Sequence, residues 1–218
     1  ENRKYRQYAA DIYTISNTLL GYTQDLLTFS KTETGYITLM EKPSDVAEIV
    51  NKTLRFMADK MHSERRNIKV KMMEPSPKLI VDEFRLQQIL TNLLLYMFHY
   101  TAADRALSLE TRIVTENKER QFFVLLISND ESVSMSNIAL SDWVERLHGM
   151  SEWGPLASKE REDVSKGQAD LSFDLGKALV ALHQGYTGIE HGEKAITIAV
   201  FFPTTRIHFS DREQKTQN

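Results

Sequence analysis

The segment R-L-Q-Q-I-L-T-N-L-L-L-Y-M-F-H-Y-T, Arg85 to Thr101, decides how the chain is interpreted. Its apolar residues recur at the three- and four-residue steps of one helical face, which predicts a packed helix. Polar residues lie where a binding site is expected on such a helix, at Asn92 and His99. Between them lies Tyr96, a bulky phenol. What this helix binds therefore depends on the rest of the chain.

The composition is typical of a folded protein without a basic surface. The chain has 218 residues, of which 41% are hydrophobic, and this is ample for a buried core. The net charge is -3 and the isoelectric point is about 6.1. Two short basic clusters, residues 2–6 and 60–71, are interpreted as solvated surface. We therefore expect neither nucleic acid nor a membrane surface as a partner of this fragment.

Cysteine is absent, which excludes disulfides, thiol catalysis and thiolate metal sites, and which fits a reducing compartment. No apolar run approaches the roughly 18 residues needed to span a bilayer. The chain begins with charged and aromatic residues, without a signal peptide or an initiator methionine. We expect it to be an excerpt from a longer protein.

The chain begins with a heptad pattern of apolar residues, called the seam below. Eight apolar residues alternate in steps of three and four: Tyr5, Tyr8, Ile12, Ile15, Leu19, Tyr22, Leu26 and Phe29. This spacing predicts one continuous helix with a single apolar stripe. Gly21 weakens that helix by roughly 0.5–1 kcal/mol relative to alanine, so packing against a partner must support it. A two-helix hairpin or a dimer bundle is favoured over a long core helix of one domain.

The remaining chain alternates between strand and helix patterns. A helix is expected to begin after an N-cap at Ser44 or Asp45 and to bury Val46, Ile49 and Val50. A further helix is expected at residues 171–182, and strands are expected at residues 35–41, 67–73, 79–82, 108–114, 121–129 and 195–203. This order predicts an α/β two-layer sandwich, with helices on one face of a mixed sheet, preceded by a long helix of the coiled-coil type.

Three segments resemble sensor histidine kinases in the order in which that family has them. T-Q-D-L-L-T-F-S-K-T-E-T-G-Y-I-T-L, residues 23–39, resembles the end of the second dimerisation helix and its linker. D-E-F-R-L-Q-Q-I-L-T-N-L-L, residues 82–94, is similar to the ATP-binding helix, and A-L-V-A-L-H-Q-G-Y-T-G-I-E, residues 178–190, to the phrase after the second glycine box.

The resemblance implies a Bergerat-type ATPase-like fold. It divides the chain into a dimerisation helix (1–33), a linker (34–43), a sandwich of the HATPase type (44–206) and a polar tail (207–218). It also implies a cytoplasmic location, as a free protein or as the cytoplasmic part of a membrane-bound sensor.

In that family the ATP-binding helix carries two asparagines one turn apart, followed by a lysine. The first asparagine is kept as Asn92, the second falls on Tyr96, and the lysine falls on His99. Magnesium prefers compact oxygen ligands in octahedral geometry at about 2.1 Å, so a neutral phenol is a poor substitute. We expect the Tyr96 ring to fill part of the nucleotide cavity and Asn92 to be a structural amide.

The two glycine boxes of the family are also changed. The adenine-binding aspartate falls on Asn129, whose carbonyl oxygen can still accept a hydrogen bond, and the glycines of that box fall on Glu131 and Val133. The phosphate-binding glycines fall on Gln168, Asp170 and Ser172. Asp170 and Asp174 would repel a triphosphate. Residues 136–166, with Trp143 and Trp153, occupy the place of the ATP lid and are expected to be a docked helix or a partner surface.

None of the six histidines lies in a phosphoacceptor phrase, and no pair of them has metal-site spacing. His183 is interpreted as a packing residue. The changed boxes suggest a degenerate core, a pseudo histidine kinase, that binds no cofactor and no metal. Such a module would act in a two-component or phosphorelay system as a homodimer, through the seam residues Ile12, Ile15, Leu19, Tyr22, Leu26 and Phe29, and would dock a response regulator or a partner histidine kinase.

Two alternatives stay open. In the first, the chain is a divergent but active kinase domain that binds Mg-ATP in an unusual pose, with Asn92, Asn129 and His99, and phosphorylates a histidine upstream of Glu1. In the second, a dimer hairpin holds the reactive histidine of a phosphotransferase and the sandwich only supports it.

Overall fold

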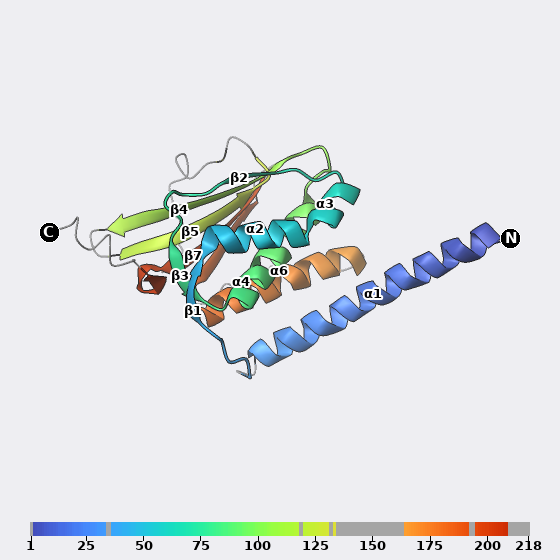
Figure 1. Ribbon diagram of the computed structural model, residues 1–218, viewed down its shortest axis with the longest axis horizontal. Helices are drawn as coiled ribbons and strands as arrows, with labels where there is room; N and C mark the ends of the chain where they lie inside the picture. Colours follow the sequence, from blue (N-terminus) through green and yellow to red (C-terminus); the bar gives the residue numbers. More distant parts are fainter. Residues whose placement is uncertain are drawn as a thin grey trace.

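The computed structural model describes residues 2–33, 36–117, 120–130, 133, 164–191 and 195–208. A long helix, α1 (Asn2–Glu33), precedes an α/β sandwich. The helices of the sandwich are α2 (Val46–Phe56), α3 (Ala58–Ser63), α4 (Glu83–Tyr100) and α6 (Val164–Leu182). They lie on one side of the sheet, and α1 runs beside α6 and projects beyond the sandwich at its N-terminal end (Figure 1).

The main sheet has the strand order β2-β4-β5-β7-β6. Its strands are β2 (Ile68–Lys71), β4 (Leu107–Asn117), β5 (Arg120–Ser128), β6 (Tyr186–His191) and β7 (Ile196–Pro203). β2 and β4 are parallel and the other pairs are antiparallel, so the sheet is mixed. The predicted two-layer sandwich of the Bergerat type is confirmed.

The central strands β5 and β7 are apolar at nearly every position because both of their faces are buried. Phe123, Leu125 and Ile127 belong to the core under the helices, whereas Phe122, Val124 and Leu126 belong to a second cluster on the opposite face. A strand that is buried on both faces has a continuous apolar sequence rather than an alternating one. This explains the run from Phe122 to Ile127.

A small antiparallel sheet closes the end of the sandwich near the linker. It has the order β1-β3-β8, with β1 (Lys42–Asp45), β3 (Lys78–Val81) and β8 (Ile207–His208). Asp45 is the N-cap of α2, as predicted, and its carboxylate accepts a hydrogen bond from the Glu48 N–H at 3.1 Å. The 3-10 helix η1 (Thr204–Arg206) leads from β7 into β8.

Several elements differ from the sequence prediction. Residues 36–41 form no strand, because their alternation reflects one-sided packing of Ile37 on the core, and the strand begins at Lys42. Residues 186–191 form β6, which the sequence analysis missed because Thr187 and Gly188 interrupt the apolar pattern. Ile207 and His208, assigned to the polar tail, pair with β3, so the sandwich continues to His208. Residues 209–218 lie outside the described residues.

The apolar seam of α1 is exposed where its side chains are described. Tyr5, Tyr8, Ile12 and Leu26 each expose more than half of their surface. The side chains of four seam residues lie outside the described part: Ile15, Leu19, Tyr22 and Phe29. Tyr13, Leu20 and Leu27, which the seam prediction did not include, are spaced by seven residues and are also exposed. A helix with such a wide exposed apolar face is not a core helix of the sandwich.

Candidate functional site

The candidate site lies on α4, which is fixed at both ends. At its N-terminus, the Asp82 carboxylate accepts a hydrogen bond from the Arg85 N–H at 3.1 Å. At its C-terminus, the Arg66 guanidinium donates to the carbonyl oxygen of Thr101 at 2.5 Å and to that of Phe98, and it lies over the Phe98 ring. A cation at a helix C-terminus compensates the last free carbonyls. These contacts position the side chains that α4 presents to its neighbours.

The side chain of Tyr96 extends from α4 to α6, and only 4% of the residue is exposed. Its ring centroid is 4.7 Å from that of Tyr100 and 4.9 Å from that of Phe173 on α6. The Tyr100 hydroxyl donates to the Asp170 carboxylate at 2.8 Å. The space between the two helices is therefore occupied by three aromatic rings and one carboxylate.

The phenols in this cluster are neutral at physiological pH. Burial, together with the charges of Asp170 and Asp174, raises the pKa of Tyr96 to about 12. Burial and the hydrogen bond to Asp170 also raise the pKa of Tyr100 above its ordinary value. A protonated phenol is not a ligand that magnesium prefers. The aromatic cluster therefore offers no metal-binding charge at the position of Tyr96.

Asn92 is buried on the same helix, one turn before Tyr96. Within the described part of the chain, its side-chain nitrogen has no hydrogen-bond partner. Helix α6 approaches closely here, because a Cβ added to Gly176 would lie 3.1 Å from Leu93 Cδ2 and 3.7 Å from Asn92 Cβ. The close packing of two helices leaves the amide nitrogen of Asn92 buried and without a partner among the described residues, which is the costly state of a polar group.

Asn129 connects three elements at the end of β5. Its carbonyl oxygen accepts the Ile196 N–H at 2.7 Å, and its amide group donates to Thr101 Oγ1 at 3.1 Å. The Asn129 N–H also donates to the Ile196 carbonyl oxygen at 3.2 Å. The amide oxygen expected to face an adenine thus accepts a hydrogen bond from the protein backbone.

The positions of the phosphate-binding glycines lie inside α6 rather than in a loop. This helix begins at Val164, seven residues before the predicted start, so Asp170 and Ser172 are beyond its first turn. Backbone N–H groups beyond the first turn are bonded within the helix and are not free to bind phosphate. The side chain of Gln168, residue Glu131 and residues 134–163 lie outside the described residues, whereas Val133 packs partly buried against the second apolar cluster.

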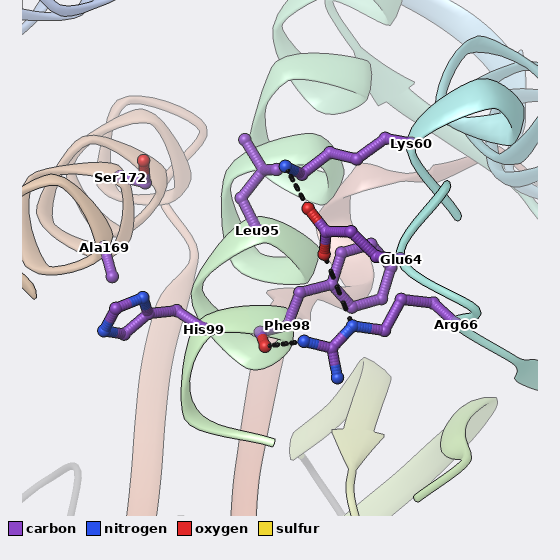
Figure 2. A pocket seen from close by; sticks show the side chains of 8 residues that line it. All are labelled: Lys60, Glu64, Arg66, Leu95, Phe98, His99, Ala169 and Ser172. Carbon is purple, nitrogen blue, oxygen red and sulfur yellow. Dashed lines mark hydrogen bonds and ion pairs between the residues drawn. The ribbon is translucent and has the colours of Figure 1, made fainter. Parts of the chain in front are cut away.

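The His99 ring packs edge-on against Tyr100, at the margin of the aromatic cluster. It lines a pocket of about 280 Å³ between α3, α4 and α6 (Figure 2). The other lining residues are Lys60, Glu64, Arg66, Leu95, Phe98, Ala169 and Ser172. Burial pushes the pKa of Glu64 upward, but its bonds to Lys60 at 2.6 Å and to Arg66 at 3.4 Å lower it overall. Most of the positive charge in this pocket is therefore already paired.

His183 is a fully buried packing residue, in line with its interpretation from the sequence. Its Nδ1 lies 2.8 Å from the Leu179 carbonyl oxygen, and its Nε2 accepts the Asp82 N–H at 3.3 Å. This pair of bonds requires the neutral ring, and burial lowers the pKa of His183. Among the described residues, no three His, Asp or Glu side chains form a group that could hold a metal ion.

The comparisons with known proteins agree with this fold. No family model matches the chain. The cell-division control histidine kinase PdhS of Brucella ovis is 22% identical over 207 residues, which cover 94% of this chain and 20% of that protein. The PdhS of Brucella abortus matches to the same extent. The chain therefore resembles a sensor histidine kinase core. It spans about a fifth of the length of these curated relatives.

Two solved histidine kinases have the same fold. Acinetobacter baumannii AdeS has a TM-score of 0.60 and 17% identity, over 86% of this chain and 79% of that chain. Full-length ShkA, solved in complex with AMPPNP, has a TM-score of 0.65 and 17% identity, over 94% of this chain and 39% of that chain. In the part of the chain that the structure describes, no helix is long and apolar enough to cross a membrane.

The predicted site residues of this chain fall into separate groups. Tyr96 and Asp170 join the aromatic cluster, and Asn92 is buried one turn earlier on α4. Asn129 bonds to Thr101 and β7, and His99 faces the pocket. The sequence analysis missed Tyr100, Phe173 and Arg66. Tyr100 follows Tyr96 by four residues, and side chains at this spacing are neighbours on a helix. The contact between Tyr96 and Tyr100 could therefore have been predicted from the sequence.

Proposed function

We propose that this histidine kinase core is a non-catalytic signalling module of a two-component or phosphorelay system, with little or no binding of Mg-ATP. The observation that carries the proposal is the burial of the Tyr96 ring between Tyr100 and Phe173. A nucleotide in the family's usual position would have to displace this ring from α4. The cost of opening a packed aromatic cluster is subtracted from any affinity for the nucleotide.

The carboxylates beside Tyr96 and the helical backbone of α6 support the same proposal. Asp170 and Asp174 place two carboxylates beside Tyr96, and both act on its hydroxyl electrostatically. Two negative charges near a triphosphate weaken its binding unless a cation compensates them. The continuous helix α6 also leaves no free backbone N–H groups at Asp170 and Ser172.

In this proposal the module acts through protein contacts. The exposed apolar face of α1 would pair with a second copy of the chain, because its three- and four-residue spacing is that of a helix bundle. A response regulator or a partner histidine kinase would then dock on the dimer. Residues 1–33 are the dimerisation unit, residues 34–43 the linker and residues 44–206, extended to His208, the sandwich. The fragment would work in the cytoplasm, alone or as part of a membrane-bound sensor.

One observation favours a second candidate function, that of a divergent active kinase domain. The pocket of about 280 Å³ beside His99 is open, and Lys60 and Arg66 line it (Figure 2). Asn92 also keeps a buried amide nitrogen without a partner among the described residues. A nucleotide bound in an unusual pose would place its phosphates in this pocket, and the phosphorylated histidine would lie upstream of Glu1.

Titration calorimetry with Mg-ATP and Mg-ADP separates the two candidates. The proposal expects no saturable heat, and it expects no rise in the melting temperature. A ligand at 100 times its dissociation constant would otherwise add about 2.7 kcal/mol to the stability of the chain. The matched variant Lys60→Ala reports on the second candidate, since it removes a cation from the pocket and leaves Tyr96 in place. Saturable binding that this variant weakens would reject the non-catalytic proposal.

A further inference from the structure

The linker between α1 and the sandwich is held by side chains of the sandwich. The Met40 N–H donates to Asp82 Oδ2 at 2.9 Å, and the Glu41 carboxylate pairs with Arg206 Nη1 at 2.5 Å. Ile37 packs against the core of the sandwich. At the start of the linker, the Tyr36 N–H donates to the Lys31 carbonyl oxygen at 3.0 Å, which ties the linker to the end of α1.

Asp82 connects the linker to the helix that carries the candidate site. One of its carboxylate oxygens caps α4 through the Arg85 N–H, and the other accepts the Met40 N–H. Its backbone N–H donates to His183 at the end of α6. One residue therefore joins the linker to the N-terminus of α4 and to the C-terminal end of α6.

Arg206 is the second attachment point and is itself buried. Only 7% of its surface is exposed, and it also donates to the Ile80 carbonyl oxygen at 2.9 Å. Its Nε has no hydrogen-bond partner within the described part of the chain. A buried guanidinium depends on its carboxylate partner, because an unpaired buried charge is costly. Release of Glu41 from the sandwich would leave this charge without its counter-ion.

We propose that Met40 and Glu41, held by Asp82 and Arg206, form a latch that fixes α1 alongside α6 and couples movement of α1 to the N-terminus of α4. With the latch closed, α1 stays beside α6 in the arrangement of Figure 1, and α1 and the sandwich move as one body. With the latch open, the linker becomes a flexible tether and the sandwich moves independently of α1. A signal that rotates α1 would thus reach the site helix through Asp82. The latch does not depend on whether the chain binds a nucleotide.

Asp82→Asn tests the latch without removing the helix cap. Asparagine caps helices about as well as aspartate, so its side-chain oxygen keeps the bond to Arg85. Its amide nitrogen cannot accept the Met40 N–H. Hydrogen exchange should therefore become about tenfold faster at the Met40 amide. Exchange at the Glu48 amide, which Asp45 caps on α2, should stay unchanged and shows that the sandwich remains folded.

Spin labels measure the movement of α1 directly. The chain contains no cysteine, so Ala9→Cys on α1 and Ala181→Cys on α6 introduce two unique, exposed labelling sites. Labelled chain is diluted in unlabelled chain, so that any dimer carries labels on one copy only. The wild-type background should give one narrow distance distribution, and the combined Glu41→Ala and Asp82→Asn variant should give a broad one.

Glu48→Ala is the control, because it removes a glutamate from an exposed ion pair with Lys52 on α2 and should keep the narrow distribution. A broad distribution in the wild-type background would overturn the proposal. A narrow distance distribution in the combined variant, with the Glu48 amide still protected from hydrogen exchange, would overturn it as well.

Discussion

The rings of Tyr96 on α4 and Phe173 on α6 lie with their centroids 4.9 Å apart. This contact joins the helix that carries the family's magnesium ligand to the helix that follows its phosphate loop. The distance lies within the range of favourable aromatic pairs, so this contact holds the two helices together. Under the proposed function, the stability of the sandwich and the closure of the site therefore depend on the same side chains.

Tyr96→Ala should destabilise the sandwich by about 3–5 kcal/mol, because it removes a buried ring and leaves a cavity between α4 and α6. Tyr96→Phe keeps the ring and should cost less than about 1.5 kcal/mol. Urea denaturation followed by circular dichroism measures both values. Tyr36→Ala is the matched control, since the Tyr36 side chain is 82% exposed and its loss should change the free energy of unfolding by no more than about 0.5 kcal/mol. Equal effects at Tyr96 and Tyr36 would contradict the packing of this ring.

Asn129→Ala should cost about 1–3 kcal/mol of unfolding free energy. The change leaves the partly buried Ile196 N–H without its acceptor and Thr101 Oγ1 without its donor. Hydrogen exchange at the Ile196 amide should become faster in the variant. Thr101→Ser keeps a hydroxyl at the same position and serves as the control. A variant at Asn129 with unchanged exchange at Ile196 would show that the amide is not the connection inferred between β5 and β7.

The stability of the chain should fall as the pH is lowered below about 6.5, the ordinary pKa of histidine. The neutral His183 ring accepts the Asp82 N–H, and burial lowers the pKa of His183 in the folded state. The unfolded chain therefore binds the proton first, and stability is lost from about pH 6.5 downward to the folded-state pKa. His183→Gln should be less stable at pH 8 but should lack this dependence. Denaturant midpoints measured between pH 5 and pH 8 compare the variant with the wild-type chain. If the midpoints of both proteins change with pH to the same extent, His183 is not the source of the pH dependence.

The sequence predicted the sandwich well because its helices and strands carry strong periodic patterns. Asp45 as N-cap, the α4 segment and the apolar run of β5 were all found from local patterns. Of the aromatic cluster, only the Tyr96 ring was singled out from the sequence. Its contact with Phe173 was missed, because Phe173 comes from a helix more than 70 residues away in the sequence. The pairing of Glu41 with Arg206 had no local signal at all. Contacts between residues so distant in sequence depend on the packing of the whole fold.

Two glycines should respond in opposite ways to replacement by alanine. Gly185 lies in the turn between α6 and β6, where an added Cβ would lie 2.7 Å from the Phe201 carbonyl oxygen and 2.8 Å from Val180 Cγ1. Gly185→Ala should therefore destabilise the sandwich by about 1–3 kcal/mol, since the backbone must shift. Among the described residues, and apart from the adjoining backbone of α1, no atom lies within 4 Å of a Cβ added to Gly21, so Gly21→Ala should stabilise α1 by roughly 0.5–1 kcal/mol. Denaturant unfolding measures the first effect and hydrogen exchange along α1 measures the second. Slower exchange in α1 with an unchanged sandwich would confirm that Gly21 is a weak point of this helix, whereas faster exchange would indicate that a partner packs closely against it.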